Sequence, residues 1–343
     1  MTLAAPADRF AGYLTAGTQT EFHPLRHLSR KSASPVSNIK CLLELYRLFR
    51  RERPDVALLY TIKPNILGNF AAVCAGVRTI SVVEGLGYGG SLAARWRWVA
   101  APLYRLALLR AYRVVFLNED DRQEFLQSRL VTPGQARLVH GPGVDSTHFA
   151  PAPAKKSASL VFLFSGRLLS EKGIFEFVSA AREIRRENPA VECWVLGAPD
   201  SGNPSAVAPS DLDHWIAEGV VKYLDKAEDV RPTLALADVL VLPSYYREGV
   251  PRSVLEAMAM EKIVITTDTP GCRDTVEESR NGFLVPPRDV QALVAAMLRV
   301  LALTPEQRVQ MGARSRQKVE EMFSDARVLP HYLVEIAEAV ERR

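Results

Sequence analysis

The chain has 343 residues, of which 48% are hydrophobic and 24% charged. This composition is typical of a globular enzyme, and the length is sufficient for two domains with separate cores. The net charge of +4 is small, so the total charge indicates no nucleic-acid partner. No apolar run predicts a membrane span, the first residues do not resemble a signal peptide, and the four cysteines lack the spacing of metal ligands or of a disulfide framework. We therefore expect a cytoplasmic protein with reduced thiols.

Residues 1–150 have the pattern of one α/β domain. Apolar runs of strand length occur at Asp55–Tyr60, Thr79–Val83 and Arg113–Leu117, and helical spacing occurs over Asn38–Arg50. Alternating strands and helices predict a parallel sheet with helices on both faces.

The first residues of this domain are unusual. The segment Thr2–Asp8 has the pattern of a strand end and its following turn, without an earlier strand or a glycine-rich loop before it. A doubly wound domain usually begins with a central strand whose turn lies over the ligand cleft. We therefore expect the first domain to be incomplete and to lack its opening strand, loop and helix.

Residues 94–113 form a basic, aromatic-rich segment. No acidic residue lies between Glu84 and Glu119, whereas five arginines are interleaved with tryptophans and leucines. Basic residues with interfacial aromatics are typical of docking onto an anionic membrane surface. The alternative is a packed helix whose arginines face solvent. The arginines and tryptophans are Arg95, Arg97, Arg105, Arg110, Arg113, Trp96 and Trp98.

The stretch Ala150–Ser159 is rich in proline, alanine, serine and lysine, and this indicates an interdomain linker. A second α/β domain is predicted over residues 151–327. The last segment, residues 328–343, contains a predicted helix over Leu329–Val340. This helix could pack on the first domain or on the second. The strands predicted in the second domain are Leu160–Phe164, Val191–Leu196, Val220–Leu224, Val239–Pro243, Ile263–Thr266 and Gly282–Val285.

Two cations follow the first strand of the second domain. Arg167 and Lys172 lie in a strand-to-helix turn, which is where ligands of open α/β sheets bind. Arginine presents a planar fork to phosphate oxygens and lysine a mobile point charge, so the pair favours a diphosphate.

A second phosphate site is predicted after Val239–Pro243. There a Gly-Val-Pro turn enters the helix predicted over Arg252–Met260, and the free N–H groups and the dipole of a helix start attract phosphate. Glu248 and Glu256 flank this turn, and Glu256 could accept hydrogen bonds from vicinal hydroxyls. The alternative is a buried helix cap beside a solvated acid.

Three segments of the second domain together resemble the family-4 retaining glycosyltransferases of GT-B fold. They are SGRLLSEKG, DVLVLPSYYREGVPRSVLEAMA and TTDTPGCRDTVEESRNGFLVPPRD. In the first domain, Thr61–Asn65, Val82–Gly90 and Phe116–Phe125 are similar to a subgroup that acts on polyprenyl-diphosphate-linked sugars in bacterial surface-polysaccharide assembly. The resemblance implies an α/β protein with two Rossmann-like parallel-sheet domains, acceptor-binding and nucleotide-sugar-binding, and a cleft between them.

The resemblance also implies the role of each matching residue. Arg167 and Lys172 match cations that bind the donor diphosphate, and Glu248 matches the acid beside the transferred sugar; these three are the expected catalytic residues. Glu256 matches the acid that binds the ribose hydroxyls. A metal ion and a cofactor are not expected, because the two cations and the helix dipole stabilise the leaving diphosphate. The other expected donor-binding residues are Gly166, Gly249, Val250, Pro251, Arg252 and Tyr223.

Acceptor-binding candidates lie in the first domain at Lys63, Glu84, Gly85 and Gly87. We expect a protein at the inner face of the bacterial cytoplasmic membrane that moves a sugar, such as an N-acetylhexosamine, from a UDP-sugar to a polyprenyl-diphosphate-linked saccharide with retention. Two alternatives remain at this point. One is a nucleotide-sugar epimerase of the same fold, and the other is a catalytically silent, truncated copy that binds nucleotide or partner proteins.

Overall fold

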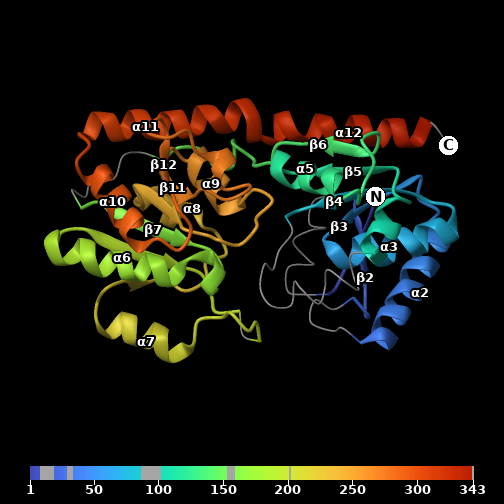
Figure 1. Ribbon diagram of the computed structural model, residues 1–343, viewed down its shortest axis with the longest axis horizontal. Helices are drawn as coiled ribbons and strands as arrows, with labels where there is room; N and C mark the ends of the chain where they lie inside the picture. Colours follow the sequence, from blue (N-terminus) through green and yellow to red (C-terminus); the bar gives the residue numbers. More distant parts are fainter. Residues whose placement is uncertain (8–18, 29–33, 86–101, 153–158, 201, 342–343) are drawn as a thin grey trace.

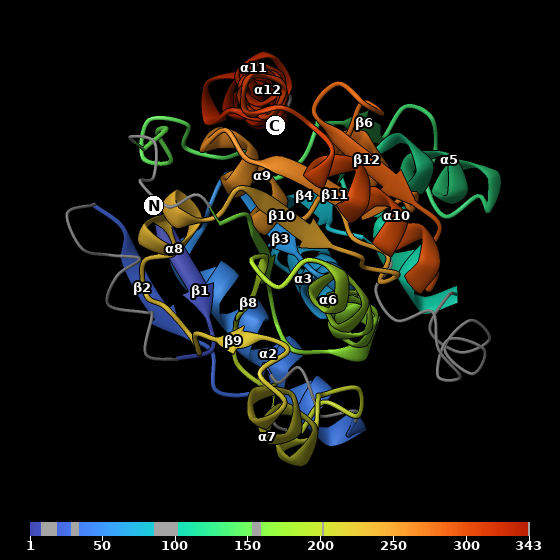
Figure 2. The same cartoon turned by 90° about the vertical axis from the view of Figure 1, so that its left-hand side faces the viewer.

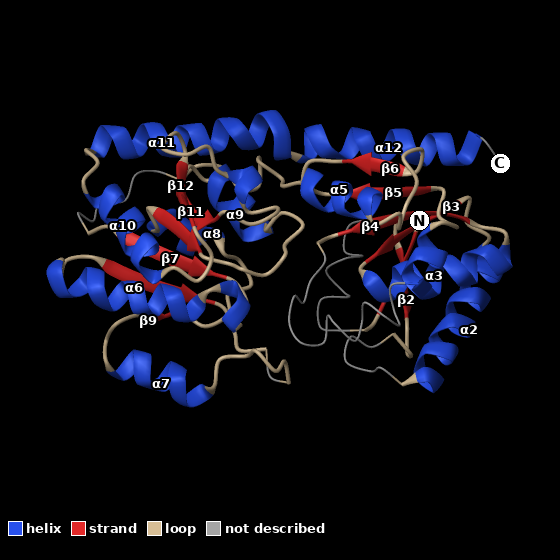
Figure 3. Cartoon of the chain, viewed as in Figure 1, coloured by secondary structure: helices blue, strands red, loops and turns tan. Residues whose placement is uncertain are grey.

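The computed structural model describes the chain except for residues 8–18, 29–33, 86–101, 153–158, 201 and 342–343. The chain forms two α/β domains side by side along the longest axis (Figure 1). In both domains helices flank the strands (Figure 3), as parallel sheets require because both of their faces are apolar. The expected α/β class with two parallel-sheet domains is confirmed.

The second domain contains a six-stranded parallel sheet in the order β12-β11-β10-β7-β8-β9. All six strands lie where the apolar runs predict them, although the strand predicted over Val220–Leu224 is shorter. β7 and β10 are buried along their whole length, so they form the centre of the core. The strands are β7 (Val161–Ser165), β8 (Glu192–Leu196), β9 (Lys222–Tyr223), β10 (Val239–Leu242), β11 (Ile263–Thr267) and β12 (Gly282–Val285).

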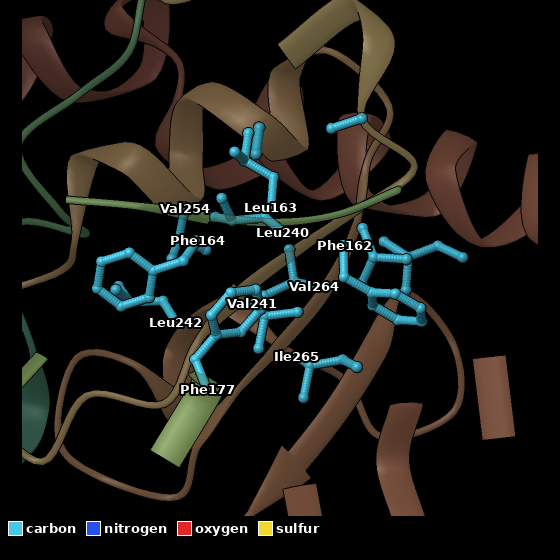
Figure 4. Close-up of a cluster of buried hydrophobic side chains, with 14 of the residues drawn as sticks. Phe162, Leu163, Phe164, Phe177, Leu240, Val241, Leu242, Val254, Val264 and Ile265 are labelled. Carbon is cyan, nitrogen blue, oxygen red and sulfur yellow. The ribbon is translucent and has the colours of Figure 1, made fainter. Parts of the chain in front are cut away.

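Helices on both sides of this sheet bury their apolar faces against it. Phe164 on β7 and Phe177 on the flanking helix α6 are fully buried, with ring centroids 5.8 Å apart (Figure 4). The helices are α6 (Ile174–Glu187), α7 (Pro209–Ala217), α8 (Arg231–Leu236), α9 (Arg252–Ala259), α10 (Val290–Leu301) and α11 (Pro305–Lys318), with short 3-10 turns η1 (Ser170–Lys172) and η2 (Arg273–Thr275).

The first domain has two parallel sheets. One pairs β1 with β2, and the other contains β3 to β6 in chain order. Within the described residues no strand pairing connects the two sheets. Thr2–Ala5, at the segment predicted to be a strand end, is β1. The elements are β1 (Thr2–Ala5), β2 (Glu21–Pro24), α2 (Pro35–Glu52), β3 (Val56–Tyr60), α3 (Ile62–Ala75), β4 (Arg78–Val83), β5 (Arg113–Phe116), α5 (Glu119–Gln127) and β6 (Ala136–Leu138).

Two helices at the end of the chain connect the domains. α11 and α12 (Asp325–Glu341) run along one side of the molecule, separated by a short π-helix, η3 (Val319–Phe323). Figure 2 shows them end-on, one behind the other, so they are nearly collinear. The bridge between Val144 and Ser324 lies where α12 begins. α12 therefore returns the chain to the first domain.

α12 is held on the first domain by apolar packing and by ion pairs. Val328 and Tyr332 belong to one buried cluster with residues of β4 and β5. Glu335 accepts hydrogen bonds from the guanidinium groups of Arg113 (2.8 Å) and Arg137 (2.7 Å). The prediction that Arg113 belongs to a membrane-facing basic segment is therefore wrong, since its charge is used inside the protein. Within the described part of the chain, no helix has both the length and the apolar character needed to cross a membrane.

Candidate active site between the domains

A cavity of about 280 Å³ lies between the two domains. Its walls come from the carboxyl ends of parallel strands, the edge at which open α/β sheets bind ligands. Glu84 follows β4, Arg167 follows β7 and Glu248 follows β10. The described residues that line it are Glu84, Leu117, Pro142, Arg167, Lys172, Glu248, Gly249, Val250, Pro251, Arg252 and Ser253.

Lys172 and Glu248 form an ion pair in the wall of the cavity. Their side chains are only 13% and 10% exposed. Ser244 also donates a hydrogen bond of 3.0 Å to the Glu248 carboxylate. A ligand phosphate that entered the cavity would compete with Glu248 for the lysine ammonium, because phosphate oxygens are strong acceptors for charged donors.

Glycine at position 173 explains how Lys172 reaches this position. Gly173 has a φ of +79°, and a Cβ at this residue would lie 2.1 Å from the carbonyl oxygen of Pro243. Only glycine tolerates both this conformation and this contact. The turn η1 therefore packs directly on the end of β10. This close packing places Lys172 beside Glu248.

Arg167 lies on the same wall but is more exposed than Lys172. Its side chain is 40% exposed, and its guanidinium is 3.2 Å from a carboxylate oxygen of Asp200. Gly166, which precedes it, lies in the turn after β7, and its N–H bonds to the carbonyl of Leu196. The structure therefore brings the two predicted diphosphate cations to one cavity, each paired with an acid from the same domain.

The start of α9 supplies a third positive element. Pro251 is the N-cap and Arg252 the first helical residue. Among the described residues, none accepts a hydrogen bond from the backbone N–H of Gly249, Val250, Arg252 or Ser253. These four residues line the cavity. Free N–H groups at a helix start bind anions, so this wall is suited to a phosphate.

Glu256 lies one turn further along α9. Its side chain is 19% exposed, and an oxygen of its carboxylate is 3.8 Å from Nε of Arg252. Burial raises the pKa of Glu256, and the neighbouring Arg252 opposes the rise. The carboxylate is therefore largely removed from water, where hydrogen bonds from a ligand hydroxyl would be strong.

Several predicted site residues are not part of the cavity lining. Of the described lining residues, none is Gly166, Glu256, Lys63, Gly85 or Tyr223. Burial lowers the pKa of Lys63 in the first turn of α3. Tyr223 donates a hydrogen bond of 2.9 Å to Asp225, and burial raises its pKa to about 12. Gly87 lies outside the described residues.

Three lining residues were missed from the sequence: Leu117, Pro142 and Ser253. Pro142 lies in the segment HGPGV, whose glycines indicate a turn, so this segment could have suggested a loop at the cleft. Among the described residues, no group of three or more histidine, cysteine, aspartate or glutamate side chains is arranged to hold a metal ion. That the protein works without a metal stays a prediction.

Comparison with known proteins identifies the family. Residues 159–302 match the family described as "Glycosyl transferases group 1", and residues 2–142 match the "Glycosyl transferase 4-like domain". The chain belongs to the group 1, or GT4, glycosyltransferases. The resemblance inferred from the motifs is confirmed, and so is the assignment of the chain as a glycosyltransferase.

Two curated bacterial enzymes are similar over most of this glycosyltransferase. UDP-Gal:alpha-D-GlcNAc-diphosphoundecaprenol alpha-1,3-galactosyltransferase of Escherichia coli is 26% identical, over 79% of this chain and 72% of that protein. N,N'-diacetylbacillosaminyl-diphospho-undecaprenol alpha-1,3-N-acetylgalactosaminyltransferase of Campylobacter jejuni is 28% identical, over 74% of this chain and 70% of that protein.

Solved structures share the fold. Anabaena Alr3699/HepE, solved in complex with UDP and glucose, superposes with a TM-score of 0.78. The match covers 98% of this chain and 91% of that chain at 17% sequence identity. This likeness confirms the GT-B architecture of the glycosyltransferase.

Proposed function

We propose that this glycosyltransferase moves a sugar, an N-acetylhexosamine or another hexose, from a UDP-sugar to a polyprenyl-diphosphate-linked saccharide with retention of configuration. The wider activity, transfer from a nucleotide sugar in bacterial polysaccharide biosynthesis, follows from the family and its relatives. The observation that carries the proposal is that Arg167, Lys172, Glu248 and the start of α9 surround one interdomain cavity.

Each element of the cavity has a chemical role in this proposal. Arg167, Lys172 and the N–H groups at the start of α9 bind the diphosphate and stabilise the charge that it gains as the bond from the sugar C1 to its oxygen breaks. The acceptor hydroxyl forms the new bond to C1 on the same face, and its proton passes to the departing diphosphate oxygen. Glu248 lies beside the sugar, and Glu256 accepts hydrogen bonds from the ribose hydroxyls.

The acceptor binds on the wall that the first domain provides. Glu84 lines the cavity, and Gly85 follows it, so these two residues contact the saccharide in this proposal. Lys63 contacts the acceptor diphosphate in this proposal, and Gly87, outside the described residues, is a further predicted acceptor contact. The names of the E. coli and C. jejuni relatives specify undecaprenyl-diphosphate acceptors, which supports an acceptor of this class.

Incubation with a panel of UDP-sugars and bacterial lipid extracts tests this function. We expect one UDP-sugar to be consumed only when lipid extract is present, with a lipid product enlarged by one sugar and with activity unchanged by EDTA. Conversion of a UDP-sugar into its epimer without lipid would instead indicate an epimerase. Binding of UDP by calorimetry without turnover of any UDP-sugar would indicate a catalytically silent protein, and either this result or the absence of UDP binding would overturn the proposal.

Glu256→Ala should weaken UDP binding about tenfold, since the ribose hydroxyls lose a charged acceptor. Because burial raises the pKa of Glu256, its carboxylate takes up a proton at a pH higher than the ordinary pKa of 4.5. UDP affinity of the wild-type protein should therefore fall as the pH decreases through that raised value, whereas the variant should show no such loss.

Calorimetry with UDP and with 2′,3′-dideoxy-UDP checks this role of Glu256. The wild-type protein should prefer UDP, and Glu256→Ala should bind both ligands equally. Glu187→Ala, at an exposed acid on α6, is the matched control and should behave as wild type. A preference for UDP that persists in Glu256→Ala would exclude the ribose contact.

We further propose that the segment 94–113, apart from Arg113, contacts an anionic membrane, at the inner face of the bacterial cytoplasmic membrane. In the described part of this segment Leu103, Leu106 and Leu109 are 46%, 47% and 36% exposed, and Arg105 and Arg110 are also exposed. Exposed leucines beside arginines match the apolar and anionic layers of a leaflet.

Sedimentation with phosphatidylglycerol vesicles tests this membrane contact. Changing the three leucines to serine should lower vesicle binding at least about tenfold, given the apolar area that they would bury. The matched control changes three α12 residues of similar exposure, Leu329, Leu333 and Val334, to serine. Equal losses in both triple variants would place the contact elsewhere.

A further inference from the structure

An amide side chain of the first domain binds the backbone of the loop that carries Glu248. This Glu248 loop, residues 245–251, follows β10 in the second domain. Asn118, at the start of α5 in the first domain, donates hydrogen bonds from Nδ2 to the carbonyl oxygens of Gly249 (2.8 Å) and Glu248 (3.4 Å). The Asn118 side chain is 1% exposed. A buried hydrogen bond therefore joins the two walls of the cavity.

Asn118 is itself held in a fixed orientation. Its Oδ1 caps α5 by accepting from the backbone N–H of Asp121 (2.8 Å), and its Nδ2 also donates to the Asp121 carboxylate (2.9 Å). The other oxygen of Asp121 binds Arg247 of the Glu248 loop at 2.9 Å. Arg247 also pairs with Glu124 at 2.6 Å. The amide plane of Asn118 therefore cannot rotate without breaking several bonds at once.

Glycines allow the close approach of the Glu248 loop to its neighbours. A Cβ on Gly85, in the first domain, would lie 2.4 Å from the carbonyl oxygen of Arg247. A Cβ on Gly271 would lie 2.1 Å from the carbonyl oxygen of Gly249. A Cβ on Gly249 itself would lie 2.9 Å from the backbone of Glu84. Backbone therefore packs on backbone here, and the loop has little freedom to shift.

The geometry of the peptide bond links Asn118 to the cavity. In a planar trans peptide the C=O and the N–H point in opposite directions. Because the carbonyls of Glu248 and Gly249 point to Asn118, the N–H groups of Gly249 and Val250 point away from it. Gly249 and Val250 line the cavity, and among the described residues neither N–H has an acceptor.

We infer that Asn118 is a positioning residue that aims the Gly249 and Val250 N–H groups at the second phosphate of the donor. This inference rests on the proposed function, since it assigns those N–H groups to a nucleoside diphosphate. Asn118 touches no ligand in this role. It acts from the acceptor domain on the donor site, so the diphosphate site is complete only while the two domains are in contact.

The test compares Asn118→Ser and Asn118→Asp with the wild-type protein. Serine and aspartate both retain an oxygen that caps α5. Serine is too short to reach Gly249, and aspartate replaces the donor by an acceptor. The control is Asp289→Ala, which removes the side-chain cap of α10, a 2.9 Å bond to Ala292, at a residue that does not line the cavity. UDP and UMP are the probes, since UMP lacks the second phosphate.

Calorimetry should show about tenfold weaker UDP binding in both Asn118 variants, the size expected for a lost network of oriented donors. The affinity for UMP should change less than about twofold, because UMP has no second phosphate to contact the displaced N–H groups. Asp289→Ala should keep the wild-type ratio of the two affinities while lowering the melting temperature.

The possible outcomes separate the inference from the proposed function. A wild-type protein that binds neither UDP nor a UDP-sugar overturns the proposed function, and the role of Asn118 fails with it. A wild-type protein that binds UDP, with variants that lose UDP and UMP affinity equally or lose neither, overturns the positioning role alone. Only a selective loss of UDP affinity supports it.

Discussion

Replacement of Lys172 by alanine is expected to lower kcat by roughly 10²- to 10³-fold, the cost of removing one preorganised group that stabilises a leaving charge. The Lys172 side chain is only 13% exposed, so water cannot replace its charge. The variant also leaves the buried carboxylate of Glu248 without its cation. Lys172→Arg keeps the charge, yet its planar fork cannot occupy the same small space, so we expect partial activity.

Steady-state kinetics with the identified UDP-sugar measures this effect, and calorimetry with UDP separates binding from chemistry. Lys222→Ala is the matched control, because Lys222 is exposed on β9 of the same domain, where it stacks on Trp194 at 4.5 Å. The control should keep wild-type kinetics. A Lys172→Ala protein with full kcat and a wild-type melting temperature would remove Lys172 from the reaction.

Replacement of Phe177 by alanine should lower the free energy of unfolding of the second domain by about 3–5 kcal/mol. Phe177 is fully buried between α6 and the sheet, and its ring lies against Phe164 at an interplanar angle of 40° (Figure 4). Deleting the ring leaves a cavity at the centre of the domain, which the fixed strands cannot fill.

The same helix provides the control for this effect. Phe175 is 39% exposed and makes an edge contact with Trp215 at 5.3 Å. Phe175→Ala should therefore cost about 1 kcal/mol. Urea unfolding followed by circular dichroism measures both variants. Equal losses would show that the packing of Phe177 against the sheet is not what stabilises this domain.

The cavity wall of the second domain could be predicted from the sequence because it is local. Arg167 and Lys172 lie in one strand-to-helix turn, and Glu248 and Glu256 flank another. Both turns follow strands that are continuous apolar runs, and the carboxyl ends of parallel strands meet at one edge. The segment pattern therefore predicted that Arg167, Lys172 and Glu248 share one cavity.

Residues whose position depends on packing between distant segments could not be predicted in this way. Asn118 contacts Gly249 across 131 residues of sequence. Arg113 was interpreted as part of a basic surface because its partner, Glu335, lies 222 residues later. Charge patterns of neighbouring residues contain no information on such pairs. The same reason explains why Leu117 and Pro142 were missed.

The chain crosses between the domains twice, once after Val144 and once near Ser324, and hydrogen bonds connect the two crossings. The N–H of Val144 bonds to the carbonyl of Phe323 at 3.0 Å, and the N–H of Asp325 bonds to the carbonyl of Val144 at 2.9 Å. Two connections fastened together act as a single pivot, and residues far from a pivot move furthest when the domains rotate. If the proposed function holds, opening the cleft for the exchange of UDP would therefore need only small torsion changes near Val144 and Ser324. The same rotation would separate Asn118 from Gly249, so release of the nucleotide and loss of the phosphate-binding geometry would be one mechanical event.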